Sequence, residues 1–88
     1  MIDLGSGHGY SRYVNEDEQW IGIIDHHLKP DGKPCGGGAV LFDVPANAYA
    51  SVDKWTLVSE EPFHLEPSLL CRLCGDHGFI REGRWVPA

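Results

Sequence analysis

The chain has 88 residues and a mass of 9.7 kDa, which is enough for one small domain with a marginal hydrophobic core. Its formal net charge of −6 argues against electrostatic binding to nucleic acid or to an anionic membrane. An apolar fraction of 42% excludes a compositionally disordered chain. The 11 glycines and 6 prolines favour many turns and short strands over long helices.

We predict one domain over residues 1–88, with 1–19 as a polar lead-in. After it come seven short segments that are rich in branched and aromatic residues and are separated by turn signals. They are residues 20–24, 39–44, 54–60, 63–65, 69–71, 78–81 and 84–86. Glu82-Gly83 predicts a two-residue hairpin turn or a glycine bulge between the last two. The pattern predicts an all-β fold of six or seven short strands, either a small barrel or a two-layer sandwich.

No apolar run is long enough to cross a bilayer, and the first residues lack the basic and apolar regions of a signal peptide. We therefore expect a cytoplasmic protein with reduced thiols and no membrane partner.

The densest chemistry lies near the C-terminus, where Cys71 and Cys74 have the Cys-x2-Cys spacing that lets two thiolates from one turn bind a single tetrahedral ion. His77 follows three residues later and offers an imidazole. Cys35, in a glycine-rich turn, is the natural fourth ligand and would link the first half of the chain to the last. The sequence therefore predicts Zn²⁺ held by Cys35, Cys71, Cys74 and His77, a staple that a marginal core needs.

Alternatives to this ligand set remain open. His27 could replace His77 or Cys71, and His64 is a further candidate. Because adjacent residues of a strand point to opposite faces, at most one of His26 and His27 is expected to face the site. The thiols could also be free and partly buried, or two of them could form a disulfide.

The segment LEPSLLCRLCGDHGFIREGRW, residues 65–85, resembles the C-terminal signature of small uncharacterised proteins of actinobacterial phages and prophages. It is similar, more distantly, to a bacterial domain of unknown function that also has a cysteine-containing, glycine-rich turn upstream, as at Pro34-Cys35-Gly36. This chain departs from the distant pattern in having one upstream cysteine and an extra Cys71. The resemblance implies an all-β, metal-stapled fold and a phage or prophage source, and it brings no established activity.

The first functional hypothesis is a zinc-stabilised binding module, a phage accessory protein that binds a host protein or a small anionic ligand and blunts host defence. Residues 67–88 carry three arginines and two acids, whereas residues 1–66 carry 4 basic and 11 acidic residues. Arg72, Arg81 and Arg84 could therefore cluster near the metal and bind an anion such as a nucleotide phosphate, in one subunit or in a homo-oligomer. We expect the three tryptophans (Trp20, Trp55 and Trp85) to belong mainly to the core, with exposed ones available for contact.

Other function classes compete with this one. A small metal-dependent hydrolase would use Cys74, His77 and His27 as ligands with Asp76, Asp25 or His64 as general base, but the chain has no H-x-x-x-H pair. A virion or assembly component cannot be separated from a binding module by sequence. The acidic balance disfavours a nucleic-acid binder.

Overall fold

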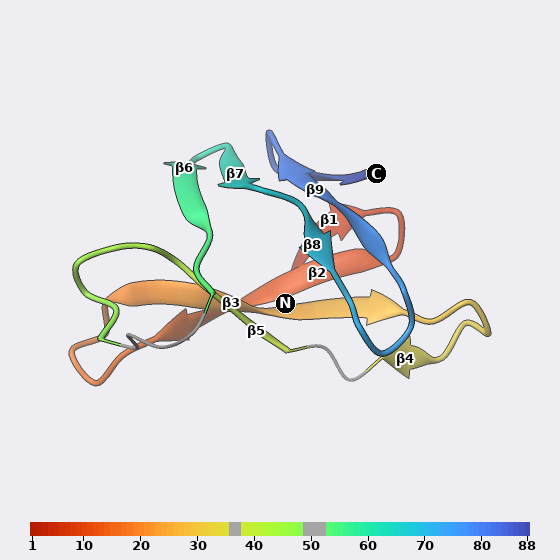
Figure 1. Ribbon diagram of the computed structural model, residues 1–88, viewed down its shortest axis with the longest axis horizontal. Coiled ribbons are helices and arrows are strands. Elements are labelled where there is room, and N and C mark those ends of the chain that lie inside the picture. Colours follow the sequence, from red (N-terminus) through yellow and green to blue (C-terminus); the bar gives the residue numbers. More distant parts are fainter. Residues whose placement is uncertain (36–37, 49–52) are drawn as a thin grey trace.

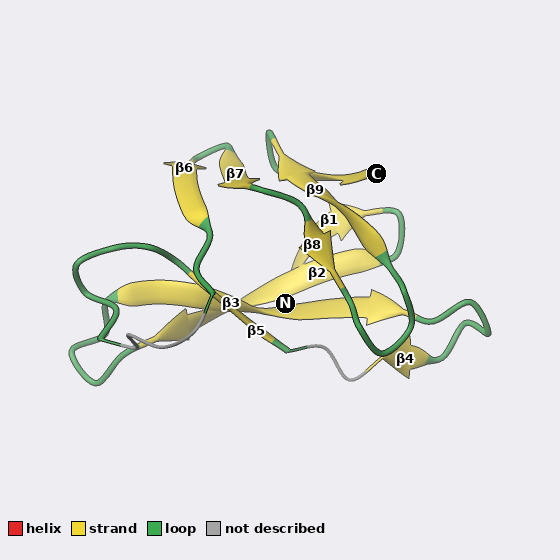
Figure 2. Cartoon of the chain, viewed as in Figure 1, coloured by secondary structure: helices red, strands yellow, loops and turns green. Residues whose placement is uncertain are grey.

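The computed structural model describes residues 1–35, 38–48 and 53–88. Within these residues the chain forms ten short β-strands and no helix (Figures 1 and 2). The strands are β1 (Ile2–Gly5), β2 (His8–Val14), β3 (Trp20–Leu28), β4 (Pro34–Cys35), β5 (Ala39–Leu41), β6 (Thr56–Glu60), β7 (Phe63–Glu66), β8 (Leu69–Leu70), β9 (His77–Arg81) and β10 (Arg84–Pro87). The all-β prediction is confirmed.

Strand β3 is the centre of the largest sheet. It pairs antiparallel with β2 along its whole length, and on its other edge with β5 at Gly22–Ile24 and with β4 at His27–Leu28. Strand β1 extends the sheet beyond β2. The later strands form a three-stranded antiparallel sheet in the order β10-β9-β8 and a two-stranded β6-β7 hairpin. Figure 1 shows these two small sheets above the long β2 and β3 strands, as a second layer.

The core lies between the two layers and is strongly aromatic. Phe42, Ile23, Leu65 and Ile80 are 0% exposed, and they come from the loop after β5 and from β3, β7 and β9. The Phe63 ring stacks at a tilt on Tyr10, with the ring centroids 4.7 Å apart. Every sheet thus contributes to one cluster of packed side chains. Burying side chains of this size is the main stabilising term in a domain of this length.

The seven predicted strand segments all contain strands, but three further strands were not expected. Residues 1–19, predicted as a polar lead-in, instead form β1 and β2. Gly5 and Gly7 have positive φ angles of 81° and 76°, which allow the tight turn between these strands. This hairpin contributes the buried side chains of Leu4 and Tyr10 to the core.

The last hairpin is as predicted. Glu82 and Gly83 connect β9 to β10 as a two-residue turn, with Arg81 paired to Arg84. Both turn residues have positive φ angles, of 51° and 75°, which a type I′ hairpin turn requires. No helix among the described residues is long and apolar enough to cross a membrane.

Candidate metal centre

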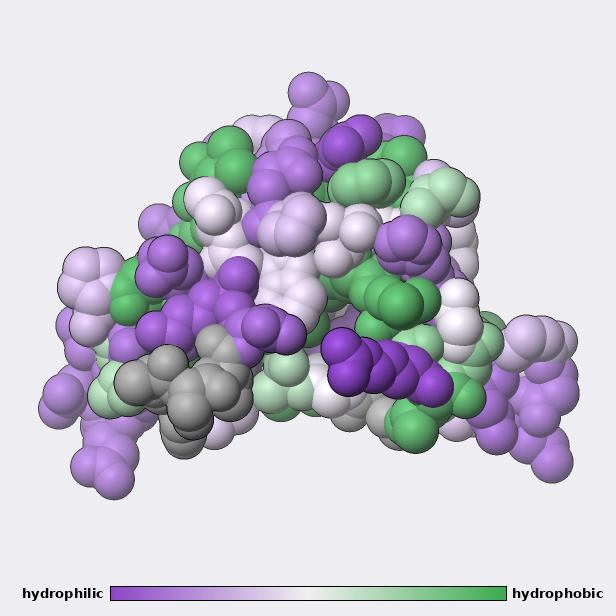
Figure 3. Space-filling model, viewed as in Figure 1, coloured by the Kyte–Doolittle hydropathy of each residue, from purple (hydrophilic) through white to green (hydrophobic). Residues whose placement is uncertain are grey.

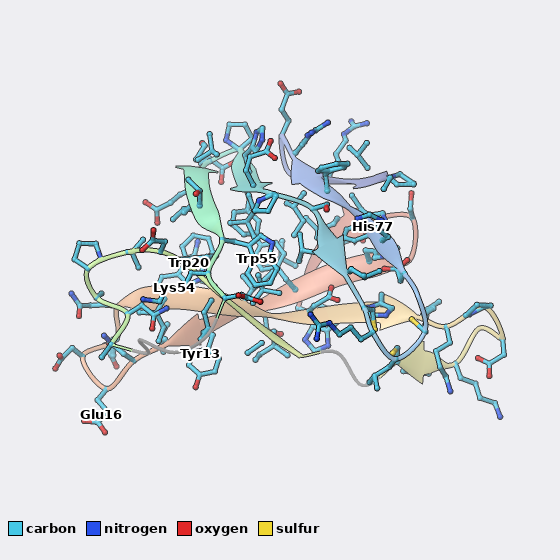
Figure 4. All side chains as sticks on the ribbon, in the orientation of Figure 1. Tyr13, Glu16, Trp20, Lys54, Trp55 and His77 are labelled. Carbon is cyan, nitrogen blue, oxygen red and sulfur yellow. The ribbon has the colours of Figure 1, made fainter. Side chains whose placement is uncertain are left out.

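Four side chains from distant parts of the sequence converge at one end of the molecule. His27, Cys35, Cys71 and Cys74 place one ligand atom each so that all four atoms lie within 4.8 Å of one another. His27 and Cys35 are buried, and Cys71 and Cys74 are half-buried. In Figure 4 yellow sulfur atoms gather near β4 and the loop that leads into β9. This is the only such group of metal-ligating side chains in the described part of the chain.

Strand pairing brings the first two ligands together. His27 in β3 lies directly opposite Cys35 in β4. Residues opposite each other in an antiparallel pair project to the same face with their Cβ atoms about 5 Å apart. Gly36 and Gly37 of the predicted glycine-rich turn lie outside the described residues.

A tight turn after β8 supplies the other two ligands. The Cys71 carbonyl accepts a hydrogen bond from the Gly75 backbone N–H at 2.8 Å, and the Cys71 N–H donates to the Asp76 carbonyl at 2.7 Å. Gly75 closes this turn with a φ of 80°, a conformation that side chains disfavour. Both thiols of the Cys-x2-Cys spacing thereby face the His27–Cys35 pair.

The distances fit a tetrahedral ion. The Cys35 and Cys71 sulfur atoms are 3.8 Å apart, and His27 Nε2 lies 3.2 Å from the Cys74 sulfur. Sulfur atoms bound to one tetrahedral zinc at about 2.3 Å are separated by about 3.8 Å. Three thiols and one imidazole also match the Cys3His donor set of structural zinc sites. The residues present therefore fit a zinc ion.

The thiols differ in their ease of ionisation in the metal-free site. Burial, followed by the neighbouring sulfur atoms of Cys71 and Cys74, raises the pKa of Cys35 to about 11. Burial also opposes ionisation of Cys71, but the backbone N–H groups of Cys74 and Leu73 outweigh it and lower its pKa to about 7. Cys71 is therefore the sulfur best prepared to receive a cation at neutral pH.

Asp25 orients the histidine ligand. His27 Nδ1 lies 2.9 Å from Asp25 Oδ2, which leaves Nε2 for the metal. Burial disfavours a charge on His27, but its hydrogen bond to Cys74 and the Asp25 carboxylate prevail and raise its pKa to about 9 in the metal-free site. A carboxylate on the second ring nitrogen is the usual support for a zinc-bound histidine.

The other histidines considered from the sequence lie outside this group. His77 is exposed on β9 and hydrogen-bonds through Nε2 to the Ser68 hydroxyl at 2.9 Å. Figure 4 shows His77 away from the sulfur atoms. His64 pairs with Glu66 in the β6-β7 hairpin, and His26 points to the opposite face of β3, where it contacts the Ser11 hydroxyl. His27, the alternative ligand, is thus the imidazole that joins the three cysteines.

The three arginines do not form one cluster. Arg81 and Arg84 face each other across the β9-β10 hairpin, and Arg81 lies 3.6 Å from Glu66 and over the Phe79 ring. Arg72 is in the Cys71–Cys74 turn, before the start of β9. Strand β9 separates it from Arg81 by about 13 Å of extended chain.

The tryptophans are mostly part of the core, as expected. Trp85 is 6% exposed and stacks on His8 with the ring centroids 4.0 Å apart. Trp20 and Trp55 are partly buried and pack against the core cluster. The Trp55 indole N–H donates to the Ser68 carbonyl at 3.1 Å.

No protein-family model, curated protein or solved structure matches this chain.

Proposed function

We propose that this chain is a small binding module whose fold is completed by a structural Zn²⁺ ion. The observation that carries the proposal is the convergence of His27, Cys35, Cys71 and Cys74 from three separate segments onto one point. Zinc bound there would tie the end of the main sheet, β3 and β4, to the turn between β8 and β9. Structural zinc sites contribute directly to folding free energy, by about 10–16 kcal/mol in zinc-finger peptides.

The donor count favours a structural role over a catalytic one. A catalytic zinc keeps an open position for water beside three protein ligands, whereas four protein donors fill a tetrahedral shell. Here three thiols and an imidazole supply all four donors. The hydrolase hypothesis also used His77 as a ligand, and His77 instead contacts Ser68.

Two matched histidine variants test the zinc site. Native mass spectrometry of the wild type and of His77→Ala should give one zinc per chain, and His27→Ala should lose zinc in a competing chelator that leaves the other two loaded. Thermal unfolding on the same samples should show a lower melting temperature for His27→Ala alone. Zinc retained by His27→Ala and lost by His77→Ala, or a folded wild type without metal, would overturn the proposal.

The cellular role is a separate part of the proposal, and it rests on the resemblance of residues 65–85 to phage proteins. We infer an accessory protein that works in the host cytoplasm, where thiols stay reduced, and binds a host component. Expression of the chain in a host should then restore plating of phages that a defence system restricts. Unchanged plating against every restricted phage would contradict this role.

A further inference from the structure

A cavity of about 280 Å³ opens beside the metal centre, between β5 and β8. Its apolar walls are Val40, Leu69, Trp55 and Trp85. Asp25 and Cys71 line the side of the cavity that is next to the metal centre. Val40, Leu69 and Trp85 are each less than 8% exposed, so the cavity reaches the core. The volume is at the lower limit of small-molecule sites, which suits a ligand of about ten heavy atoms. On the face shown in Figure 3, hydrophobic surface lies over β8 next to strongly hydrophilic side chains.

The carboxylate of Asp25 is incompletely satisfied. Its Oδ2 atom contacts His27 Nδ1 at 2.9 Å, whereas its Oδ1 atom is buried and has no hydrogen-bond partner among the described residues. Buried polar atoms are nearly always paired, because an unpaired one forfeits its hydration without compensation. Oδ1 is closed to solvent in this conformation. Because Asp25 lines the cavity, a donor bound there would supply the missing partner once the carboxylate turns toward it.

The charges around the cavity are mainly negative. Asp25 and Asp76 both line it, although Asp76 Oδ2 already lies 2.7 Å from His8 Nε2, and Arg72 is its only basic lining residue in the described chain. Arg72 is exposed, so water screens its charge. A Zn²⁺ ion with three thiolates would add a net charge of −1 at Cys71, on the cavity wall. The site is therefore suited to a cation rather than to the anion that the arginines alone predicted.

We propose that this cavity binds a small organic amine, with an apolar body against Trp55, Leu69 and Val40 and an ammonium group directed to Asp25. The ammonium donates N–H groups that the carboxylate lacks, and pairing offsets the cost of burying its charge. The inference rests on the proposed function, since zinc holds the Cys71–Cys74 turn that forms one wall.

Three matched probes test the ligand class: 2-phenylethylamine, its neutral isostere 2-phenylethanol and the anion 3-phenylpropanoate. Each probe is titrated into zinc-loaded protein, and binding is followed by the NMR chemical shifts of the backbone amides and the indole N–H groups. The zinc content of every sample is measured. We expect saturable shifts at Val40, Leu69 and the Trp55 indole with the amine. The alcohol should bind at least tenfold more weakly, and the anion should give no saturable shift.

Two variants locate the site. Asp25→Asn keeps an acceptor for His27 but removes the charge, and at saturating zinc it should weaken amine binding at least tenfold. Ala39→Trp places a large side chain at the exposed mouth of the cavity and should abolish binding, whereas Val58→Trp, on exposed β6, should not change it.

The outcomes separate the two proposals. A zinc-loaded protein that shows no saturable amine binding, or that binds the anion as tightly as the amine, overturns the amine site and leaves the zinc site intact. Unchanged amine affinity in Asp25→Asn overturns the role of that carboxylate and the inference with it. A wild type that takes up no zinc overturns the proposed function itself.

Discussion

The two ends of this small domain are held together in different ways. At the aromatic end, Phe42, Phe63, Leu65 and Ile80 are almost completely buried and pack side chains from all three sheets. At the metal end, β4 and β8 are two residues long, and Leu28, Leu70 and Leu73 are at least half exposed. Few apolar contacts are available there to fix the chain.

This difference in burial shows that a chain of 88 residues has one hydrophobic core, at the aromatic end, and needs another means to fix the metal end. Hydrophobic burial grows with the number of residues that can be enclosed, and a domain of this size encloses few. At the metal end four side chains converge that could hold an ion. In the proposed zinc-bound protein they take the place of a second core. The aromatic end should then depend on packing, and the metal end on zinc and pH.

Removal of zinc is expected to have the largest effect. At free zinc a thousandfold above the dissociation constant, loss of the ion lowers the free energy of unfolding by about 4 kcal/mol. Cys74→Ser should produce the same loss, and a chelator should then have no further effect on that variant. Hydrogen exchange should accelerate first at β4, β8 and the 71–76 turn. Equal acceleration in β6 and β7, which carry no ligand, would show that the two ends are not distinct.

Truncation in the aromatic core should be next in size. Leu65→Ala removes a fully buried side chain, and such changes cost about 2–5 kcal/mol. Zinc stoichiometry should not change, because Leu65 lies in β7 and outside the ligand group. Val58→Ala, at a position 55% exposed on the neighbouring strand, is the control and should cost less than about 0.5 kcal/mol. Urea unfolding followed by tryptophan fluorescence measures both.

Zinc affinity should increase steeply with pH. In the metal-free site Cys35 has a pKa of about 11 and His27 of about 9, so each holds a proton at pH 7 that metal binding must displace. One proton from each residue makes the apparent affinity rise at least about a hundredfold per pH unit near neutrality, about 2.7 kcal/mol. Cys71, with a pKa of about 7, adds a fraction of a proton. Chelator competition between pH 6 and 7.5 measures the slope, after correction for the chelator. A slope that corresponds to fewer than one proton released per zinc ion would contradict this ligand set.

A glycine on β9 gives the smallest predicted change. A Cβ added at Gly78 would lie 2.6 Å from the Trp85 ring and 2.7 Å from the Val86 carbonyl oxygen. Gly78→Ala should therefore destabilise the fold by about 1–3 kcal/mol through overpacking. Gly38→Ala is the matched control, since no atom of the described residues lies within 4 Å of its added Cβ. Equal melting temperatures for the two variants would contradict the packing of Trp85 against β9.

Sequence predicted those parts of the fold that depend on local pattern. Segments with runs of branched and aromatic residues form strands. Glu82-Gly83 forms a hairpin turn in which both residues have positive φ angles, a conformation that glycine adopts readily. Strand β4 exists only because two residues pair with the end of β3, and no local pattern marks it. The β1-β2 hairpin was missed because its glycines and polar residues concealed the alternation around Tyr10.

Cys71 and Cys74 could be predicted from their spacing and Cys35 from its glycine-rich turn, but the choice of histidine could not be predicted. His77 has the favourable spacing from Cys74, yet β9 begins at His77 and its pairing with Leu70 leaves both residues exposed. His27 reaches the cysteines through its register with Cys35, which is a long-range feature. One local signal did point to it: Ile21 and Ile23 are buried on β3, and a period of two continues through Asp25 to His27.

X-ray absorption at the zinc edge of the wild-type protein would identify the four atoms that bind the ion. A Cys3His site predicts three sulfur neighbours at about 2.3 Å and one imidazole nitrogen at about 2.0 Å, with no bound water. A shell that contains an oxygen neighbour, two imidazoles or fewer than three sulfur atoms would contradict it.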